Sequence, residues 1–191
     1  MQKLSVFNLI TLDGHFAGEN GDISWHAVDE EFQDYAEKNS NAGGTLLFGR
    51  VTYELMASYW PTPAVIQEDP IVAKGMNSAR KIVFSRTLKK ADWANTRLIK
   101  DNMVEEVRKL KNESGKGLTI LGSGALVAQL TQERLIDHYQ IMVVPVAIGK
   151  GKSMFEGVKD RLKLKLTETR QFTKGNVLLC YEPQVGFSHE S

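Results

Sequence analysis

The chain has 191 residues, of which 42% are hydrophobic and 25% charged, and a formal net charge of +1. This composition is typical of one soluble globular domain, and the near-neutral charge argues against a dominant nucleic-acid surface. The single cysteine, Cys180, excludes an internal disulfide and a cysteine-based zinc cage. No apolar stretch approaches the ~18 residues of a membrane span, and the start carries no basic, cleavable leader. We therefore expect a cytoplasmic protein with one domain over residues 1–184 and a loose tail over residues 185–191.

The first third of the chain predicts two strands, each followed by a helix. A dense apolar run predicts a buried strand over Lys3–Leu12. A glycine-rich stretch from Asp13 to Asp22 follows, and loops of this length in compact domains are often functional lids. We then expect a helix near Val28–Lys38, a second buried strand over Thr45–Phe48, and a helix over Val51–Tyr59.

The middle of the chain repeats this alternation. Asp69-Pro70 has the pattern of an N-cap followed by proline at the first helical position, which predicts a helix to about Ala79. Apolar runs predict strands over Lys81–Phe84, Arg97–Ile99 and Leu118–Leu121, and helical periodicity predicts helices over Asn102–Asn112 and after Gly124.

The last third predicts a change from parallel to antiparallel pairing. A strong apolar run over Tyr139–Ile148 predicts a buried strand. Alternation at Leu162, Leu164 and Leu166 predicts a half-buried strand, and a last strand is expected over Val177–Tyr181 after a turn. The sequence therefore predicts an α/β fold, a mostly parallel central sheet flanked by helices with an antiparallel C-terminal edge.

Three strand ends carry the residues expected to bind a ligand: Gly49-Arg50, Ser85-Arg86 and Gly122-Ser123-Gly124. In open α/β sheets, ligands bind beyond the carboxyl ends of the parallel strands. Two of these junctions open helices, whose N-termini attract phosphate, and arginine binds phosphate well. An arginine beside a serine suits the 2′-phosphate of NADPH, whereas NADH calls for an acid. The alternative is that the glycines only make tight turns and the arginines are surface residues.

Other motifs fail on spacing. The G-x-G-x-x-G pattern is absent after Gly122, a P-loop would need glycine at Val146, and a nucleophile elbow around Ser123 would need glycine at Leu121 and Ala125. The four histidines have no metal-ligand spacing, so we expect no metal site: His15, His26, His138 and His189.

Three residues near the first loop have two interpretations each. Asp13 either makes a turn with Gly14 or belongs to a lid over the cofactor. Asp29 either favours the start of a helix or hydrogen-bonds a substrate ring and assists its protonation. Trp25 is close to Asp29 in the sequence, and it likewise has either a structural role or a role in the substrate site.

Taken together, these motifs resemble the dihydrofolate reductase-like superfamily, above all the C-terminal reductase domain of the bifunctional riboflavin-biosynthesis protein (the RibD C-terminal domain). The resemblance covers nearly the whole chain. Its carriers are Leu12–Gly18, Leu47–Glu54, Val83–Arg86, Gly122–Leu126, and Val144–Gly151 followed by Phe155.

The resemblance implies an NADPH-dependent reductase, usually a homodimer, acting on a pterin-like, pyrimidine (5-amino-6-(5-phosphoribosylamino)uracil-like) or related small substrate. The cofactor-binding residues that it implies are Ala17, Gly49, Arg50, Thr52, Ser85, Arg86, Gly122, Ser123, Gly124 and Ala125. The catalytic residues that it implies are Asp29, Asp13 and Trp25.

This chain departs from the bifunctional proteins in two ways. It has no zinc-deaminase motif, and Leu121 stands where an acid commonly precedes the glycine turn. The main rival hypothesis is a non-catalytic, dimeric module that binds a nucleotide or small ligand. A phosphate-ligand transferase is a third possibility.

Overall fold

The computed structural model describes residues 1–27, 29–41 and 43–184. Its strands are β1 (Leu4–Thr11), β2 (His15–Ala17), β3 (Thr45–Gly49), β4 (Arg80–Phe84), β5 (Thr96–Ile99), β6 (Leu118–Leu121), β7 (His138–Val144), β8 (Lys152–Ser153), β9 (Leu164–Gln171) and β10 (Val177–Pro183). Its helices are α1 (Glu30–Asn41), α2 (Arg50–Tyr59), α3 (Pro63–Glu68), α4 (Pro70–Ser78), α5 (Met103–Asn112) and α6 (Gly124–Gln132).

Eight strands form one sheet in the order β5-β4-β3-β6-β1-β7-β10-β9. The pairs from β5 to β7 are parallel, whereas β10 is antiparallel to both β7 and β9. A mostly parallel α/β sheet with an antiparallel C-terminal edge is therefore confirmed. Two short strands, β2 and β8, pair separately.

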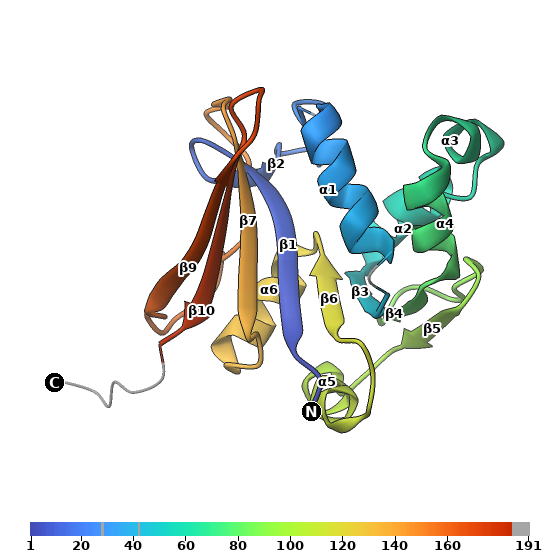
Figure 1. Ribbon diagram of the computed structural model, residues 1–191. Coiled ribbons are helices and arrows are strands. Elements are labelled where there is room, and N and C mark those ends of the chain that lie inside the picture. The colour runs from blue at the N-terminus through green and yellow to red at the C-terminus, as the bar shows by residue number, and fades with distance from the viewer. Residues whose placement is uncertain (28, 42, 185–191) are drawn as a thin grey trace, which may run out of the picture.

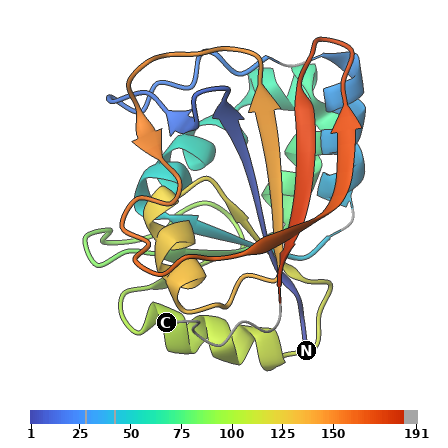
Figure 2. The same cartoon turned by 90° about the vertical axis from the view of Figure 1, so that its left-hand side faces the viewer.

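Helices cover both faces of the sheet (Figures 1 and 2), with α1 and α4 on one face and α6 on the other. The largest core cluster joins α5 and α6 to the sheet through Val107, Leu110 and Val127, each of which is at most 1% exposed. A second cluster joins α2 and α4 to β3 and β4, and a third places α1 against β7 and β10. Because both faces are covered, the carboxyl ends of the parallel strands are the place left for a ligand.

Local sequence explains where several elements begin and end. The Asp69 side chain accepts a hydrogen bond from the Val72 N–H at 3.2 Å, and Pro70 follows at the first helical position, so the predicted N-cap is confirmed. The expected strand to Ile148 is too long, because β7 ends at Val144 and Pro145 lacks the N–H that the ladder needs.

The prediction of a half-buried strand is wrong at Leu166, which is 47% exposed because β9 is an edge strand. Helix α3 was not predicted from the sequence, although Pro63 at its start is a residue that suits the first helical position. Val28, at the start of the predicted first helix, and the tail over residues 185–191 lie outside the described residues. In the part that is described, no helix has the length and apolar character needed to cross a bilayer.

Candidate functional site

The candidate site lies where the strand order reverses. The chain runs outward from β1 through β3, β4 and β5, returns to β6 beside β1, and continues to β7 on the other side of β1. The loops that leave β6 and β7 therefore diverge, and such a switch point forms a crevice at the carboxyl ends of the strands. The junctions after β3 and β6 both lie at this crevice, since β3 and β6 are parallel neighbours.

The first residues of α2 and α6 are joined by hydrogen bonds. The Gly49 N–H donates to Oγ of Ser123 at 2.6 Å. Both the N–H and the hydroxyl of Ser123 donate to Oγ1 of Thr52, each at 3.1 Å. Two helix N-termini therefore lie side by side, and their dipoles and unpaired N–H groups favour the same kind of ligand, an anion.

The glycine turn before α6 has no room for side chains. Gly122 has φ +64°, and a Cβ there would lie 2.8 Å from Cγ2 and Oγ1 of Thr52. A Cβ on Gly124 would lie 2.6 Å from the Phe16 ring on β2. The turn is therefore held from two sides, by Thr52 at Gly122 and by Phe16 at Gly124.

Two residues that the sequence reasoning missed support this turn. Asn8, 4% exposed on β1, accepts a hydrogen bond from the Gly122 N–H at 2.7 Å. Its signal is visible in the sequence, because it is a polar residue in phase with the buried Leu4 and Val6 of the same strand. Phe16 gave no comparable signal, since only the pairing of β2 with β8 brings its ring to Gly124.

A pocket of about 620 Å³ adjoins the start of α2; we call it the Arg50 pocket. It is lined by Arg50, Glu54, Thr87, Leu88, Lys89, Lys90 and Asp92. It connects the first turns of α2 with the segment that follows β4. The pocket therefore shares its Arg50 wall with the start of α2, and three of its lining residues are cations.

Ser85 and Arg86 lie at the same level of the sheet as Arg50, because Gly49 is paired with Phe84. The Ser85 hydroxyl accepts hydrogen bonds from the N–H groups of Thr87 and Leu88. The Arg86 side chain is 83% exposed and lies 3.4 Å from Asp101. Ser85 thus holds the segment that contributes Thr87 and Leu88 to the Arg50 pocket, whereas Arg86 is paired with Asp101, which lines a second pocket.

Asp13 fastens two loops at the carboxyl end of β1. Its carboxylate accepts hydrogen bonds from the N–H groups of Ile148 and Gly149, at 3.1 and 2.7 Å. A hydrogen bond with the Thr11 side chain, followed by those from the Gly149 and Ile148 N–H groups, lowers the pKa of Asp13 far below its usual range. Asp13 is therefore ionised at neutral pH and ties the loop after β1 to the loop after β7.

Asp29 is the N-terminal cap of the first helix. One carboxylate oxygen accepts from the Phe32 N–H at 2.7 Å and the other from the Lys174 N–H at 2.9 Å. These bonds lower the pKa of Asp29, in that order of importance. Asp29 is 9% exposed and ionised, and each of its carboxylate oxygens accepts one backbone hydrogen bond of the about four that a carboxylate can take.

Trp25 lies in the loop between β2 and α1. Its Nε1–H donates to the Asp22 carbonyl at 3.2 Å, and its ring meets the His26 ring edge-on. Among the described residues, no hydrogen bond, ion pair or ring contact joins Trp25, Asp13 and Asp29 to one another. The structure therefore brings the predicted glycine-turn residues together, whereas the three predicted catalytic residues are engaged separately: Asp13 by the loop after β7, Asp29 by Phe32 and Lys174, and Trp25 by its own loop.

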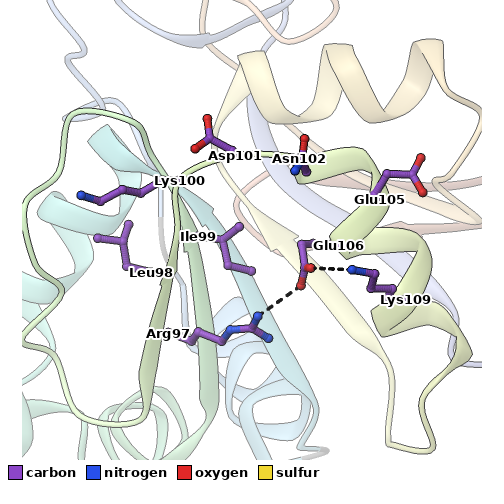
Figure 3. Close-up of a pocket in the computed structure, with 9 residues that line it drawn as sticks. All are labelled: Arg97, Leu98, Ile99, Lys100, Asp101, Asn102, Glu105, Glu106 and Lys109. Carbon is purple, nitrogen blue, oxygen red and sulfur yellow. Dashed lines mark hydrogen bonds and ion pairs between the residues drawn. The ribbon is translucent and has the colours of Figure 1, made fainter.

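A second pocket of about 620 Å³ lies at the sheet edge formed by β5 and α5 (Figure 3). Glu106 is central to it, at 3.3 Å from Arg97 and 3.1 Å from Lys109. Arg97 and Lys109 of this pocket are thus paired with Glu106, whereas Asp101 lies 3.4 Å from Arg86, outside the pocket lining. Over the described ranges, no group of three or more His, Cys, Asp or Glu side chains could hold a metal ion.

Comparison with known protein families matches residues 2–178 to the RibD C-terminal domain. The chain belongs to the RibD C-terminal domain family. Two proteins of Bacillus subtilis (strain 168), both described as uncharacterized, are similar over most of their length. YyaP is 35% identical over 187 residues, covering 94% of this chain and 95% of YyaP. YwjB is 27% identical over 175 residues, covering 90% and 92%.

Solved structures of this family type share the fold. A putative riboflavin biosynthesis protein from Shewanella sp. PV-4 aligns with a TM-score of 0.72 at 21% identity, over 96% of this chain and 99% of that one. The Thermotoga maritima diaminohydroxyphosphoribosylaminopyrimidine deaminase/5-amino-6-(5-phosphoribosylamino)uracil reductase aligns with a TM-score of 0.68 at 17% identity. This chain covers 57% of that longer protein, and 96% of this chain is aligned.

Proposed function

We propose that this protein is an NADPH-dependent reductase that transfers a hydride to a small pterin-like or pyrimidine-like substrate. Family membership supports the coarser part of this proposal, a reductase-like enzyme of the RibD C-terminal type. The finer part rests on one observation: the starts of α2 and α6 are bonded together through Ser123 at the switch point of the sheet. Paired helix starts of this kind suit a pyrophosphate.

The residues present fit a dinucleotide phosphate. Glycine at positions 122 and 124 lets a ligand approach the backbone, and a side chain at either would collide with Thr52 or Phe16. Arg50 and Lys89 lie in the adjoining pocket, within reach of a further phosphate. When bound, NADPH would supply the hydride, and the protein would contribute orientation and exclusion of water.

The substrate end of the site is proposed to lie toward Asp29. Because its pKa is lowered, Asp29 is an anion at neutral pH and is suited to accept a hydrogen bond from a protonated ring nitrogen. In this role it would orient the ring and favour its protonated form, with the proton itself coming from solvent. Asp13 would hold together the loops after β1 and β7, which would lie over the cofactor.

The test is a titration with NADPH, NADH and ATP, followed by NADPH fluorescence. We expect NADPH to bind best. Thr52→Val should weaken NADPH binding about tenfold, because Ser123 loses the acceptor that holds it against Gly49. Thr131→Val is the matched control: it removes a buried hydroxyl of α6 that pairs with Tyr139 at 3.0 Å, away from the glycine turn.

Unchanged NADPH affinity in Thr52→Val, or equal weakening in both variants, would contradict the proposed phosphate site. Absence of any nucleotide binding would overturn the reductase proposal altogether. A second candidate, a nucleotide-binding module without catalysis, is favoured by the engagement of Asp13 and Asp29 with backbone N–H groups. It predicts tight NADPH binding without turnover on pterin or pyrimidine substrates.

A further inference from the structure

The Arg50 pocket contains an acid that the proposed phosphate contacts do not use. Glu54 lies one turn beyond Arg50 on α2, and its Oε2 accepts a hydrogen bond from Nη1 of Arg50 at 2.8 Å. The Arg50 and Glu54 side chains are 45% and 47% exposed. The ion pair therefore lies on the wall of the pocket, open to solvent, and both partners can rearrange when a ligand enters.

The other charges of the pocket are unevenly paired. Lys90 lies 2.8 Å from Asp92, and both side chains are mostly exposed. Lys89, on the same wall, has no ion-pair partner in the described part of the chain. The pocket thus has three cations and two acids, which gives it one cation in excess and makes it suited to an anionic group.

The arrangement of Arg50 and Glu54 affects whether a phosphate or a hydroxyl group of a ligand binds better in the Arg50 pocket. A guanidinium has five N–H donors and Glu54 takes one, so Arg50 keeps donors for a ligand. A phosphate bound to those donors would also lie close to the Glu54 carboxylate, which repels it. A ribose hydroxyl, in contrast, can donate a hydrogen bond to that carboxylate.

We propose that Glu54 is a specificity-determining residue for the adenosine end of the dinucleotide. By holding Arg50 and placing a negative charge beside it, Glu54 weakens binding of a 2′-phosphate relative to a free 2′-hydroxyl. The wild-type protein then prefers NADPH only moderately and retains affinity for NADH. This inference rests on the proposed function, because it assumes that a dinucleotide occupies the two helix starts.

The test compares dissociation constants for NADPH and NADH in the wild type, Glu54→Gln and a matched control. Glu113→Gln is that control, since Glu113 pairs with Arg80 at 3.1 Å with both side chains about half exposed, at the amino end of β4 and outside the lining of the Arg50 pocket. Both variants lose one negative charge from an exposed arginine pair, so they change the net charge equally. Thermal unfolding of each variant establishes that it is folded.

We expect Glu54→Gln to tighten NADPH binding about threefold to tenfold, to leave NADH binding unchanged or weaker, and to lose most of the gain between about 0.05 M and about 0.5 M salt. Glu113→Gln should leave the ratio of the two affinities at the wild-type value. Equal tightening of both nucleotides, or an unchanged ratio in Glu54→Gln, would refute the role of Glu54 while leaving the proposed function intact. Failure of the wild type to bind either nucleotide would instead refute the proposed function, and this inference with it.

Discussion

Replacing Gly122 by alanine is the sharpest test of how the glycine turn is built. The added methyl group would lie 2.8 Å from Cγ2 and Oγ1 of Thr52, closer than real Cβ atoms approach, so Thr52 must move. Oγ1 of Thr52 is the acceptor for both the N–H and the hydroxyl of Ser123. A single methyl group at Gly122 therefore disturbs the bonds that join α2 to α6.

The size of the effect follows from two separate contributions. Gly122 has φ +64°, and alanine in a left-handed conformation costs about 1 kcal/mol or somewhat more. Moving Thr52 weakens two hydrogen bonds worth about 1 kcal/mol each. Gly122→Ala should therefore lower the free energy of unfolding by about 3 kcal/mol, which lowers the Tm by about 6–12 °C for a chain of this length.

Gly157→Ala separates these contributions, because Gly157 has φ +87° but nothing within 4 Å of an added Cβ. Urea unfolding should show a loss of about 1 kcal/mol in Gly157→Ala, with NADPH affinity unchanged. In a Thr52→Ala background, the cost of Gly122→Ala should fall to that same value, since the collision is gone. Equal costs for Gly122→Ala and Gly157→Ala in the wild-type background would refute the argument that Thr52 is held rigidly against the turn.

Two further predictions concern charged groups that the fold buries or engages. Lys81 is fully buried, its Nζ donates to the carbonyls of Met76, Asn77 and Ala79, and burial lowers its pKa to about 8. The unfolded chain therefore binds this proton more tightly than the folded chain. The free energy of unfolding of the wild type, relative to that of Lys81→Met, should rise by on the order of 2 kcal/mol between pH 7 and pH 9.5, measured by urea unfolding. A difference that does not change with pH would contradict the lowered pKa. Asp29→Asn should reduce turnover at least about tenfold with little change in NADPH affinity, since asparagine still caps α1; unchanged turnover measured at saturating substrate would remove Asp29 from the mechanism.

Much of the fold follows from the sequence because the parallel strands are buried on both faces. Such strands are short, continuous apolar runs, and the ends expected for β4, β5 and β6 fall within one residue of those observed. The errors of prediction concern strands that are not buried on both faces. The edge strand β9 is longer than its leucine alternation suggested, and β2 and β8 are too short to give any periodic signal.

The clustering of the glycine-turn residues was predictable for the same reason, since glycine after a buried strand reports directly on backbone geometry. The contacts that support that turn were not predictable, because a buried polar residue in a strand does not indicate which distant residue it bonds. Asn8 and Met154 are 146 residues apart, yet the Asn8 amide lies 2.9 Å from Sδ of Met154. Likewise, the lining of the Arg50 pocket depends on how the segment after β4 folds back toward α2, and no local pattern encodes that contact.

Ser123 shows why the turn is more than a permissive hinge. It has φ +55°, a conformation in which glycine would avoid the steric cost that serine bears. Glycine, however, would leave the Gly49 N–H without the hydroxyl that now accepts its hydrogen bond at 2.6 Å, and would remove the link to Thr52. An unpaired N–H costs about 1–3 kcal/mol where water is excluded, at least as much as the strain that glycine would relieve. A strained serine between two glycines is therefore best explained by the need to hold together two helix starts, at the place where we propose that a pyrophosphate binds.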